Sequence, residues 1–368
     1  MKQVIIAFFS FCLLQSVSVT IKAQQPTQAK NLIIFVMDGY RWKELYQGAD
    51  SSILFNRKYN RGDYNWTITK YWAANAEERR KKLMPFTWQT IASEGQLYGN
   101  RDYGNYVNVQ NSYWFSYPGR NEIFTGYCDT AINSNDYPDN PNTNVLEFIN
   151  AQPDFTGKIA TFASWDAVAR ILNRNRNHMP VNIDREDVMG NQLTPLQQEA
   201  NTWQHLLPDV FGKGERLDVG TYMLAKAYLL ANHPRILYID LGDNDDFAHA
   251  GEYGDYLDAA HYADAMIADI WKTIQADPFY KGKTDMLVMP DHGRGNGTEW
   301  TNHGARTAHS DETYLMAIGP DIAAKGEMKD ASQIYQQQYA QTIAALLGFT
   351  FTANHPIAAP VKQILVHK

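Results

Sequence analysis

The sequence contains too little cysteine for a fold held together by disulfide bonds. Cys12 and Cys128 are the only cysteines among 368 residues. Cys12 lies in an N-terminal segment that we expect to be cleaved, so Cys128 would have no partner in the mature chain. An exported chain without disulfides indicates an enzyme of a bacterial-type envelope or of the extracellular space.

Basic residues are also scarce. The chain has 33 Lys and Arg residues against 40 Asp and Glu residues, a formal net charge of −7 at pH 7. Cleavage of the N-terminal segment would remove Lys2 and Lys22 but no acid. This charge argues against a nucleic-acid polymer as a partner. A negatively charged substrate then requires a locally positive site, which bound metal ions can supply.

The apolar run near the N-terminus is too short for a membrane span. Residues 1–23 begin with Lys2, continue through an apolar run from Val4 to Leu14 and end at Ala23. This is the layout of a secretory signal peptide, whereas a span needs about 20 apolar residues. We therefore expect an exported protein, periplasmic or extracellular, with no stable membrane span after cleavage. The oligomeric state is not readable from the sequence.

Apolar runs that alternate with helical patterns predict an α/β fold with a mostly parallel central sheet covered by helices on both faces. Strands are expected over residues 31–37, 158–164, 235–241, 285–289 and 314–318. Helices are expected over residues 84–95, 167–172, 220–231, 253–276 and 333–347. Residues 24–368 are predicted to form a single catalytic domain, with cap insertions near 41–83 and 173–214.

The candidate nucleophile is Ser116. Pro118 and Gly119 follow it, at a point where a helix can start with free N–H groups that favour an anion. A serine in this position is also the commonest kind of helix cap. The catalytic interpretation therefore depends on which side chains the ends of the predicted strands place beside Ser116.

Acids and histidines follow three of the predicted strands, where ligands collect in open α/β sheets. Carboxylate and imidazole together suit Zn²⁺, and Mn²⁺ or Fe²⁺ with less preference. His303 lies close to His309 in the sequence and competes with it for the last position. The predicted metal ligands are Asp38, Asp245, His249, Asp291, His292 and His309.

Five ordered motifs resemble those of the alkaline phosphatase superfamily, and most closely its type I phosphodiesterase and nucleotide pyrophosphatase branch. They lie at 35–42, 116–126, 245–251, 291–293 and 308–310. The resemblance implies two divalent metal ions, one held by Asp38, Asp291 and His292 and the other by Asp245, His249 and His309. Ser116 would coordinate the first ion and attack phosphorus, giving a phosphoseryl intermediate.

Two features depart from that branch. Its nucleophile motif has an asparagine to hold a phosphoryl oxygen, and Gly119 stands in that place. The run Ser-x-Pro-x-Arg is similar to the sulfatase signature, in which the first residue is oxidised to formylglycine. However, the sulfatase Asp-Asp pair after the first strand is replaced here by Asp38-Gly39.

Arg120 follows Ser116 by about one helical turn. Its guanidinium could contact non-bridging oxygens of the substrate, which favours a phosphomonoester, or it could only brace the nucleophile loop. We therefore predict an exported metal-dependent hydrolase of small-molecule phosphate esters, a phosphomonoesterase or phosphodiesterase. The alternatives are a sulfatase and, ranked lower, a binding protein on the same fold.

Overall fold

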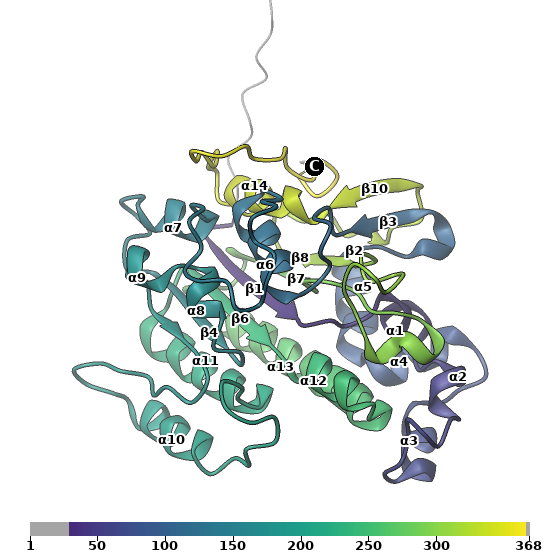
Figure 1. The fold of residues 1–368 in the computed structure, drawn as a ribbon. Coiled ribbons are helices and arrows are strands. Elements are labelled where there is room, and N and C mark those ends of the chain that lie inside the picture. Colours follow the sequence, from purple (N-terminus) through teal and green to yellow (C-terminus); the bar gives the residue numbers. More distant parts are fainter. Residues whose placement is uncertain (1–28, 366–368) are drawn as a thin grey trace, which may run out of the picture.

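The structure is a computed structural model that describes residues 29–365 (Figure 1). The predicted signal peptide lies outside these residues. Within residues 29–365, no helix combines the length and apolar character that a membrane crossing requires.

A mostly parallel eight-stranded sheet forms the centre of the fold, which confirms the predicted class. The strand order is β5-β4-β6-β1-β7-β8-β2-β9. Only β8 runs antiparallel to its neighbours β7 and β2. The strands are β1 (Asn31–Met37), β2 (Gly95–Tyr98), β4 (Ile159–Ala163), β5 (Val181–Asn182), β6 (Ile236–Leu241), β7 (Thr284–Met289), β8 (Leu315–Ile318) and β9 (Gly326–Glu327). A separate parallel pair consists of β3 (Asn105–Asn108) and β10 (Ser332–Tyr335).

Helices cover both faces of the sheet. The side chains of β1 point alternately to the two faces and all of them are buried, so both faces are covered. Ile33, Phe35 and Met37 pack in one core cluster, and Leu32 and Ile34 pack in the other. Helices of the first face include α11 (Asp218–Asn232), α12 (Asp243–Ala250) and α13 (Tyr253–Ala276). Helices of the second face include α6 (Ser116–Thr125), α7 (Val145–Asn150), α8 (Val168–Ile171) and α14 (Tyr339–Leu346).

The two segments expected as insertions contain short helices. Residues 41–83 form α1 (Trp42–Gln47), α2 (Ser51–Leu54), α3 (Tyr64–Tyr71) and α4 (Ala76–Leu83). Residues 173–214 contain α9 (Arg174–Asn177), β5 and α10 (Pro195–Gln204). Apolar side chains of the first segment, among them Leu45, Ile53 and Leu83, are part of the first core cluster.

Two predicted helices differ from the structure in detail. The helix expected over 84–95 is present over residues 85–94 and ends at Gly95, but its middle is π-helical, η1 (Thr87–Ile91), before the short α5 (Ala92–Glu94). The helix expected over 333–347 begins only at Tyr339, because the residues before it pair with β3 as β10 and then form the 3-10 turn η4 (Gln336–Gln338). Two further 3-10 turns are η2 (Arg101–Tyr103) and η3 (Gly297–Thr301).

The position of the site follows from three adjacent strands. β1 lies between β6 and β7 and is parallel to both. The carboxyl ends of all three therefore reach the same edge of the sheet. Asp38 follows β1, α12 starts directly after β6, and Asp291 and His292 follow β7.

At this edge, α6 lies in close contact with the segment after β7. A Cβ atom added at Gly119 would lie 2.4 Å from the backbone oxygen of Asp291. We expect Gly119→Ala to lower the free energy of unfolding by about 1–3 kcal/mol, because backbone cannot move aside cheaply. Denaturant unfolding measures the loss. Gly62→Ala is the matched control, because no atom lies within 4 Å of its added Cβ, and equal stability of the two variants would contradict the prediction.

Candidate metal centre and nucleophile

Three carboxylates meet at the carboxyl edge of the sheet. The two ligand-type groups are Asp38, Asp291 and His292, and Asp245, His292 and His303, each with ligand atoms within 4.8 Å of one another. The turn after β1 makes room for them at Gly39, whose φ is +56°. A Cβ atom added there would lie 2.6 Å from a carboxylate oxygen of Asp245. Only glycine fits this turn without displacing that carboxylate.

Ser116 is the first residue of α6 and is buried beside these groups. Its Oγ lies 3.3 Å from Nε2 of His292. The helix start offers an anion less than the sequence indicated, because the Tyr117 N–H donates to Oδ1 of Asn135 at 3.0 Å and Pro118 has no N–H. An anion beside Ser116 would therefore interact more with the surrounding side chains than with the helix terminus.

His292 is held with one ring nitrogen facing the acids. Its Nδ1 lies 2.9 Å from the carbonyl oxygen of Gly293, and its Nε2 lies 3.2 Å from Oδ1 of Asp38. The carbonyl can only accept, so Nδ1 carries a proton and Nε2 is the atom directed at the site. Burial lowers the pKa of His292, but Asp291 and Asp38 outweigh it and raise the pKa to about 9.

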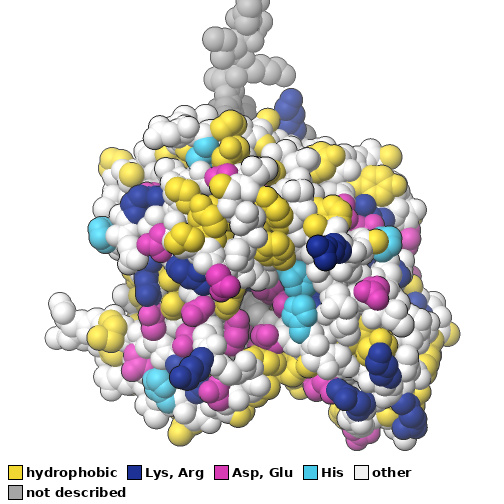
Figure 2. Space-filling view, viewed as in Figure 1, with side chains coloured by type: hydrophobic (Ala, Val, Ile, Leu, Met, Phe, Trp, Pro, Cys, Tyr) yellow, Lys and Arg dark blue, Asp and Glu magenta, His cyan; other side chains and the backbone are white. Residues whose placement is uncertain are grey.

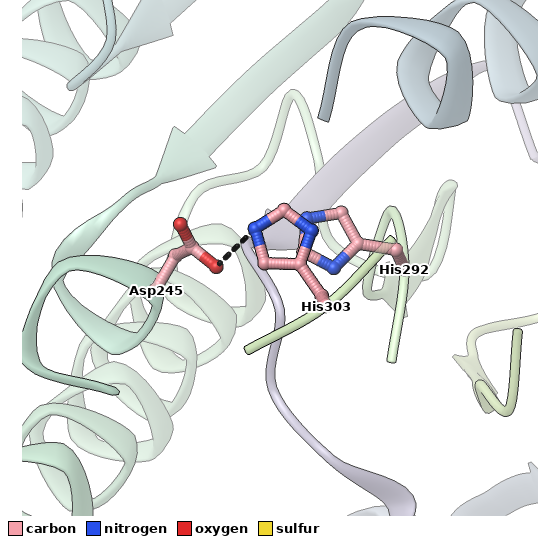
Figure 3. A group of neighbouring side chains, drawn as sticks. All are labelled: Asp245, His292 and His303. Atoms are coloured by element: carbon pink, nitrogen blue, oxygen red, sulfur yellow. Dashed lines mark ion pairs between the residues drawn. The ribbon is translucent and has the colours of Figure 1, made fainter. Parts of the chain in front are cut away.

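The structure places His303, and not His309, among the ligand-type residues. Nε2 of His303 lies 3.0 Å from Nε2 of His249, and its ring stacks on His292 with centroids 4.0 Å apart. Figure 3 shows the His303 ring between Asp245 and His292, with an ion-pair contact of 3.6 Å to Asp245. The side chain of His309 is 45% exposed and pairs with Glu312 at 3.0 Å. Because His303 lies within ligand distance of Asp245 and His292, we propose it in place of His309 as a metal ligand.

Arg120 lies beneath the site and is fully buried. Its Nη2 donates to Oδ2 of Asp38 at 2.8 Å, its Nε and Nη2 each donate to Asp240 at 2.8 Å, and its Nη1 donates to Asp291. Every nitrogen of its guanidinium is thus bonded to a carboxylate. This arrangement favours the bracing role over direct contact with a substrate.

Arg294 pairs with an acid of the second group of ligand-type residues as Arg120 does in the first group, and it was not predicted from the sequence. Its Nε and Nη2 donate to the carbonyl oxygens of Trp300 and Thr301 at 2.8 and 2.7 Å, which fixes the guanidinium. Its Nη1 donates to Asp245, and its Nη2 lies 3.4 Å from Nδ1 of His249. Burial raises the pKa of Asp245, but Arg294 outweighs it and holds that pKa well below its usual range.

The residues present fit a pair of divalent cations. Three carboxylates with three imidazoles are a donor set that zinc accepts. Oδ1 of Asp38 is buried and faces Nε2 of His292 at 3.2 Å, while Arg120 occupies only its Oδ2. A cation would therefore meet a carboxylate oxygen and a ring nitrogen that are already oriented.

Ser116 lines a pocket of about 230 Å³ together with four of the ligand-type residues, Asp38, Asp245, His249 and His303. Figure 2 shows a hollow near the middle of this face with acidic and histidine side chains around it. The remaining wall comes from Asn135, Trp165, Glu215, Gly242 and Asp246. Neither Lys nor Arg lines the pocket.

Asn135 is a functional candidate that the sequence did not identify. Its Oδ1 accepts the Tyr117 N–H, and no described residue accepts a hydrogen bond from its Nδ2. The amide thus has a free donor in the pocket that it shares with Ser116. Nothing in the local sequence signals this, since Asn135 lies in a loop after α6 and reaches Ser116 only through the fold.

Glu215 and Asp246 are acids of the pocket wall that also went unpredicted. Burial, followed by the charges of Asp246 and Asp38, raises the pKa of Glu215 to about 10. Burial and the neighbouring Asp245 raise the pKa of Asp246 to about 8. Both carboxyls are held where their ionised forms are costly without a counter-charge.

Comparisons with known proteins identify the fold. No family model and no curated protein matches the chain. The alkaline phosphatase PafA superposes with a TM-score of 0.58 at 12% identity, over 93% of this chain and 100% of that one. A 2-O GAG sulfatase gives 0.53 at 13%, over 92% and 75%. A phosphonate monoester hydrolase of Agrobacterium radiobacter gives 0.53 at 11%, over 91% and 77%. The chain has the fold of the alkaline phosphatase superfamily, as the motifs predicted.

The histidine assignment can be tested by metal content. We expect His303→Ala to lower the bound zinc of the purified mature protein by about one ion per chain, because one of the few imidazoles at the site is removed. His309→Ala is the matched control and should retain the full content, since its imidazole pairs with Glu312. Elemental analysis after dialysis measures both, and the reverse result would restore His309 to the site.

The bracing role of Arg120 can be tested by stability. Arg120→Leu leaves Asp38, Asp240 and Asp291 without their shared cation, and we expect it to lower the free energy of unfolding by about 3–5 kcal/mol. Arg61→Leu removes a more exposed ion pair with Glu252 and should cost less than about 1 kcal/mol. Arg120→Lys keeps a charge and should fall between them in denaturant unfolding. A loss for Arg120→Leu no larger than for Arg61→Leu would contradict this role.

Proposed function

We propose that the chain is a metal-dependent hydrolase of phosphate esters that uses Ser116 as its nucleophile. The observation that carries this proposal is the position of the Ser116 Oγ, 3.3 Å from His292 Nε2 in a pocket shared with Asp38, Asp245 and His303. The neighbours of known structure support it, because their names include a phosphatase and a phosphonate monoester hydrolase.

In this mechanism the Ser116 Oγ forms a bond to phosphorus while the bond from phosphorus to the alcohol breaks. Water then cleaves the Oγ–P bond and regenerates the serine. Bound divalent cations would supply positive charge that lowers the pKa of the hydroxyl and of water and stabilises the charge on the transferring group. His292 and the carboxylates of Asp38 and Asp245 would hold these cations, with Arg120 and Arg294 fixing the carboxylate orientations.

The Asn135 amide supplies a hydrogen bond that the sequence motif lacks. With its Oδ1 fixed by Tyr117, its Nδ2 can donate to a non-bridging oxygen of a phosphoryl group on Ser116. An asparagine more distant in the sequence would thus do what the residue at Gly119 cannot.

The charge of the pocket favours a phosphodiester over a phosphomonoester. A monoester brings one more negative charge than a diester, and the pocket wall offers no Lys or Arg to meet it. Glu215 and Asp246, in their ionised forms, would repel that extra charge. Arg120, which the sequence offered as a partner for a monoester, is instead enclosed by carboxylates.

The second candidate function is a sulfatase. It is favoured by the Ser-x-Pro-x-Arg run at Ser116 and by the likeness to a 2-O GAG sulfatase. That chemistry needs formylglycine at Ser116, whereas the phosphate-ester mechanism needs an unmodified serine.

The proposal can be tested on zinc-loaded protein with matched phosphodiester, phosphomonoester and sulfate-ester substrates. We expect Ser116→Ala to lower kcat for the diester at least about 10³-fold, because no other hydroxyl replaces the nucleophile. Ser112→Ala, an exposed serine of the preceding loop, should retain activity. Peptide mass spectrometry completes the test. Phosphate trapped on Ser116 supports the proposal, and formylglycine at that residue with sulfate-ester turnover would replace it by the sulfatase.

A further inference from the structure

Two carboxylates of the active-site pocket lie outside both metal-ligand groups. Glu215 comes from the loop before α11, and Asp246 comes from α12. They reach the same place, because a Cβ atom added at Gly242 would lie 3.5 Å from Oε2 of Glu215 and 3.9 Å from Oδ2 of Asp246. One small cation above Gly242 could therefore contact both.

Neither carboxylate has a partner within residues 29–365. No described side chain or backbone N–H donates a hydrogen bond to Glu215 or Asp246, and no described Lys, Arg or His forms an ion pair with them. Both are partly buried, and the nearest cations, Arg120 for Glu215 and Arg294 for Asp246, act on them only through space while paired with other carboxylates. A partly buried acid without a hydrogen-bond partner is costly, and a cationic ligand would lower that cost.

A second observation at the same pocket also points to positive ligands. The Asp38 carboxylate is 5% exposed and lines this pocket, and its Oδ1 has no described neighbour of opposite charge apart from Nε2 of His292 at 3.2 Å. A metal ion can satisfy Asp38, which belongs to a ligand-type group with Asp291 and His292. Glu215 and Asp246 belong to no such group, so they require a different cation.

Trp165 identifies the kind of cation. It lines the pocket, and its backbone forms an isolated bridge with Glu215, which sets the two residues side by side. An indole together with carboxylates recognises an organic ammonium group better than a hydrated metal ion.

We propose that the substrate carries an organic ammonium group on the alcohol attached to phosphorus, and that this group binds between Glu215 and Asp246 beside Trp165. The inference rests on the proposed function for the reacting group, but the cation site can be tested without turnover. A phosphodiester with one such ammonium has no net charge, which suits a pocket that already contains several carboxylates.

The first experiment measures binding alone. Choline is compared with its uncharged isostere 3,3-dimethylbutan-1-ol by ligand-observed NMR titration on the zinc-loaded mature protein. We expect choline to bind at least about tenfold more tightly, and Glu215→Gln to abolish this difference. Glu199→Gln, an exposed acid on α10, should keep it. Equal binding of the two alcohols to the unmodified protein would overturn the inference.

The second experiment measures selectivity in catalysis. The choline and 3,3-dimethylbutyl esters of the same phosphate are compared by kcat/KM. We expect a preference of about tenfold or more for the choline ester, reduced to near unity in Glu215→Gln and kept in Glu199→Gln, the exposed acid on α10. A proportional loss on both esters would show a merely structural role and would count against the inference.

The two experiments separate the failure of this inference from that of the proposed function. Hydrolysis of both esters at equal rates, without preferential choline binding, leaves the hydrolase and removes the ammonium site. Charge-dependent choline binding without hydrolysis leaves the site and removes the hydrolase. Loss of a bound zinc ion in Glu215→Gln, again without choline binding, would make Glu215 a metal ligand and overturn the inference.

Discussion

The repulsion among buried carboxylates at one edge of the sheet is the constraint on which the site depends. Asp38, Asp240 and Asp291 surround Arg120, and Asp245 pairs with Arg294. An unpaired buried charge costs several kcal/mol, so four such acids could not coexist without these arginines. Two guanidiniums offset only part of the negative charge, and the remainder leaves the edge suited to bind cations.

Asp38 and Asp291 could be predicted from the sequence because, in a parallel sheet, an acid that directly follows a strand lies at the carboxyl edge. An apolar run that stops at an acid places that acid at the carboxyl edge wherever the strand lies in the sheet, which is how Asp38 and Asp291 were identified. Asp240 was missed because it lies inside the run of β6, and the register pairs it with Val36 of β1. Arg120 was identified at the right spacing, but a helical period does not reveal that three carboxylates surround its guanidinium.

The loops could not be predicted in the same way. His303 and His309 are equally available by spacing, and the choice depends on tertiary packing. Trp300 is buried in the first core cluster, and the His303 ring stacks on His292, while His309 turns outward with a φ of 74°. Asn135 and Glu215 lie in irregular segments whose path is set by the sheet and not by any local period. Much of the proposed metal-ligand set can therefore be predicted from the sequence. The pocket wall around it, which includes Asn135 and Glu215, cannot.

The residues of this pocket wall would decide which class of ester the site hydrolyses. In the proposed mechanism, metal ligands at the strand ends would prepare any tetrahedral anionic ester for attack by Ser116, and they would select little among esters because they would contact only the transferring group. Selection would then fall to groups that meet the rest of the substrate, which in our proposal are two carboxylates and an indole. A doubly charged anion would meet metal ions on one side and Glu215 and Asp246 on the other. An ester whose negative charge is balanced by its own cation meets an opposite charge on each side, and this is the arrangement that the pocket favours.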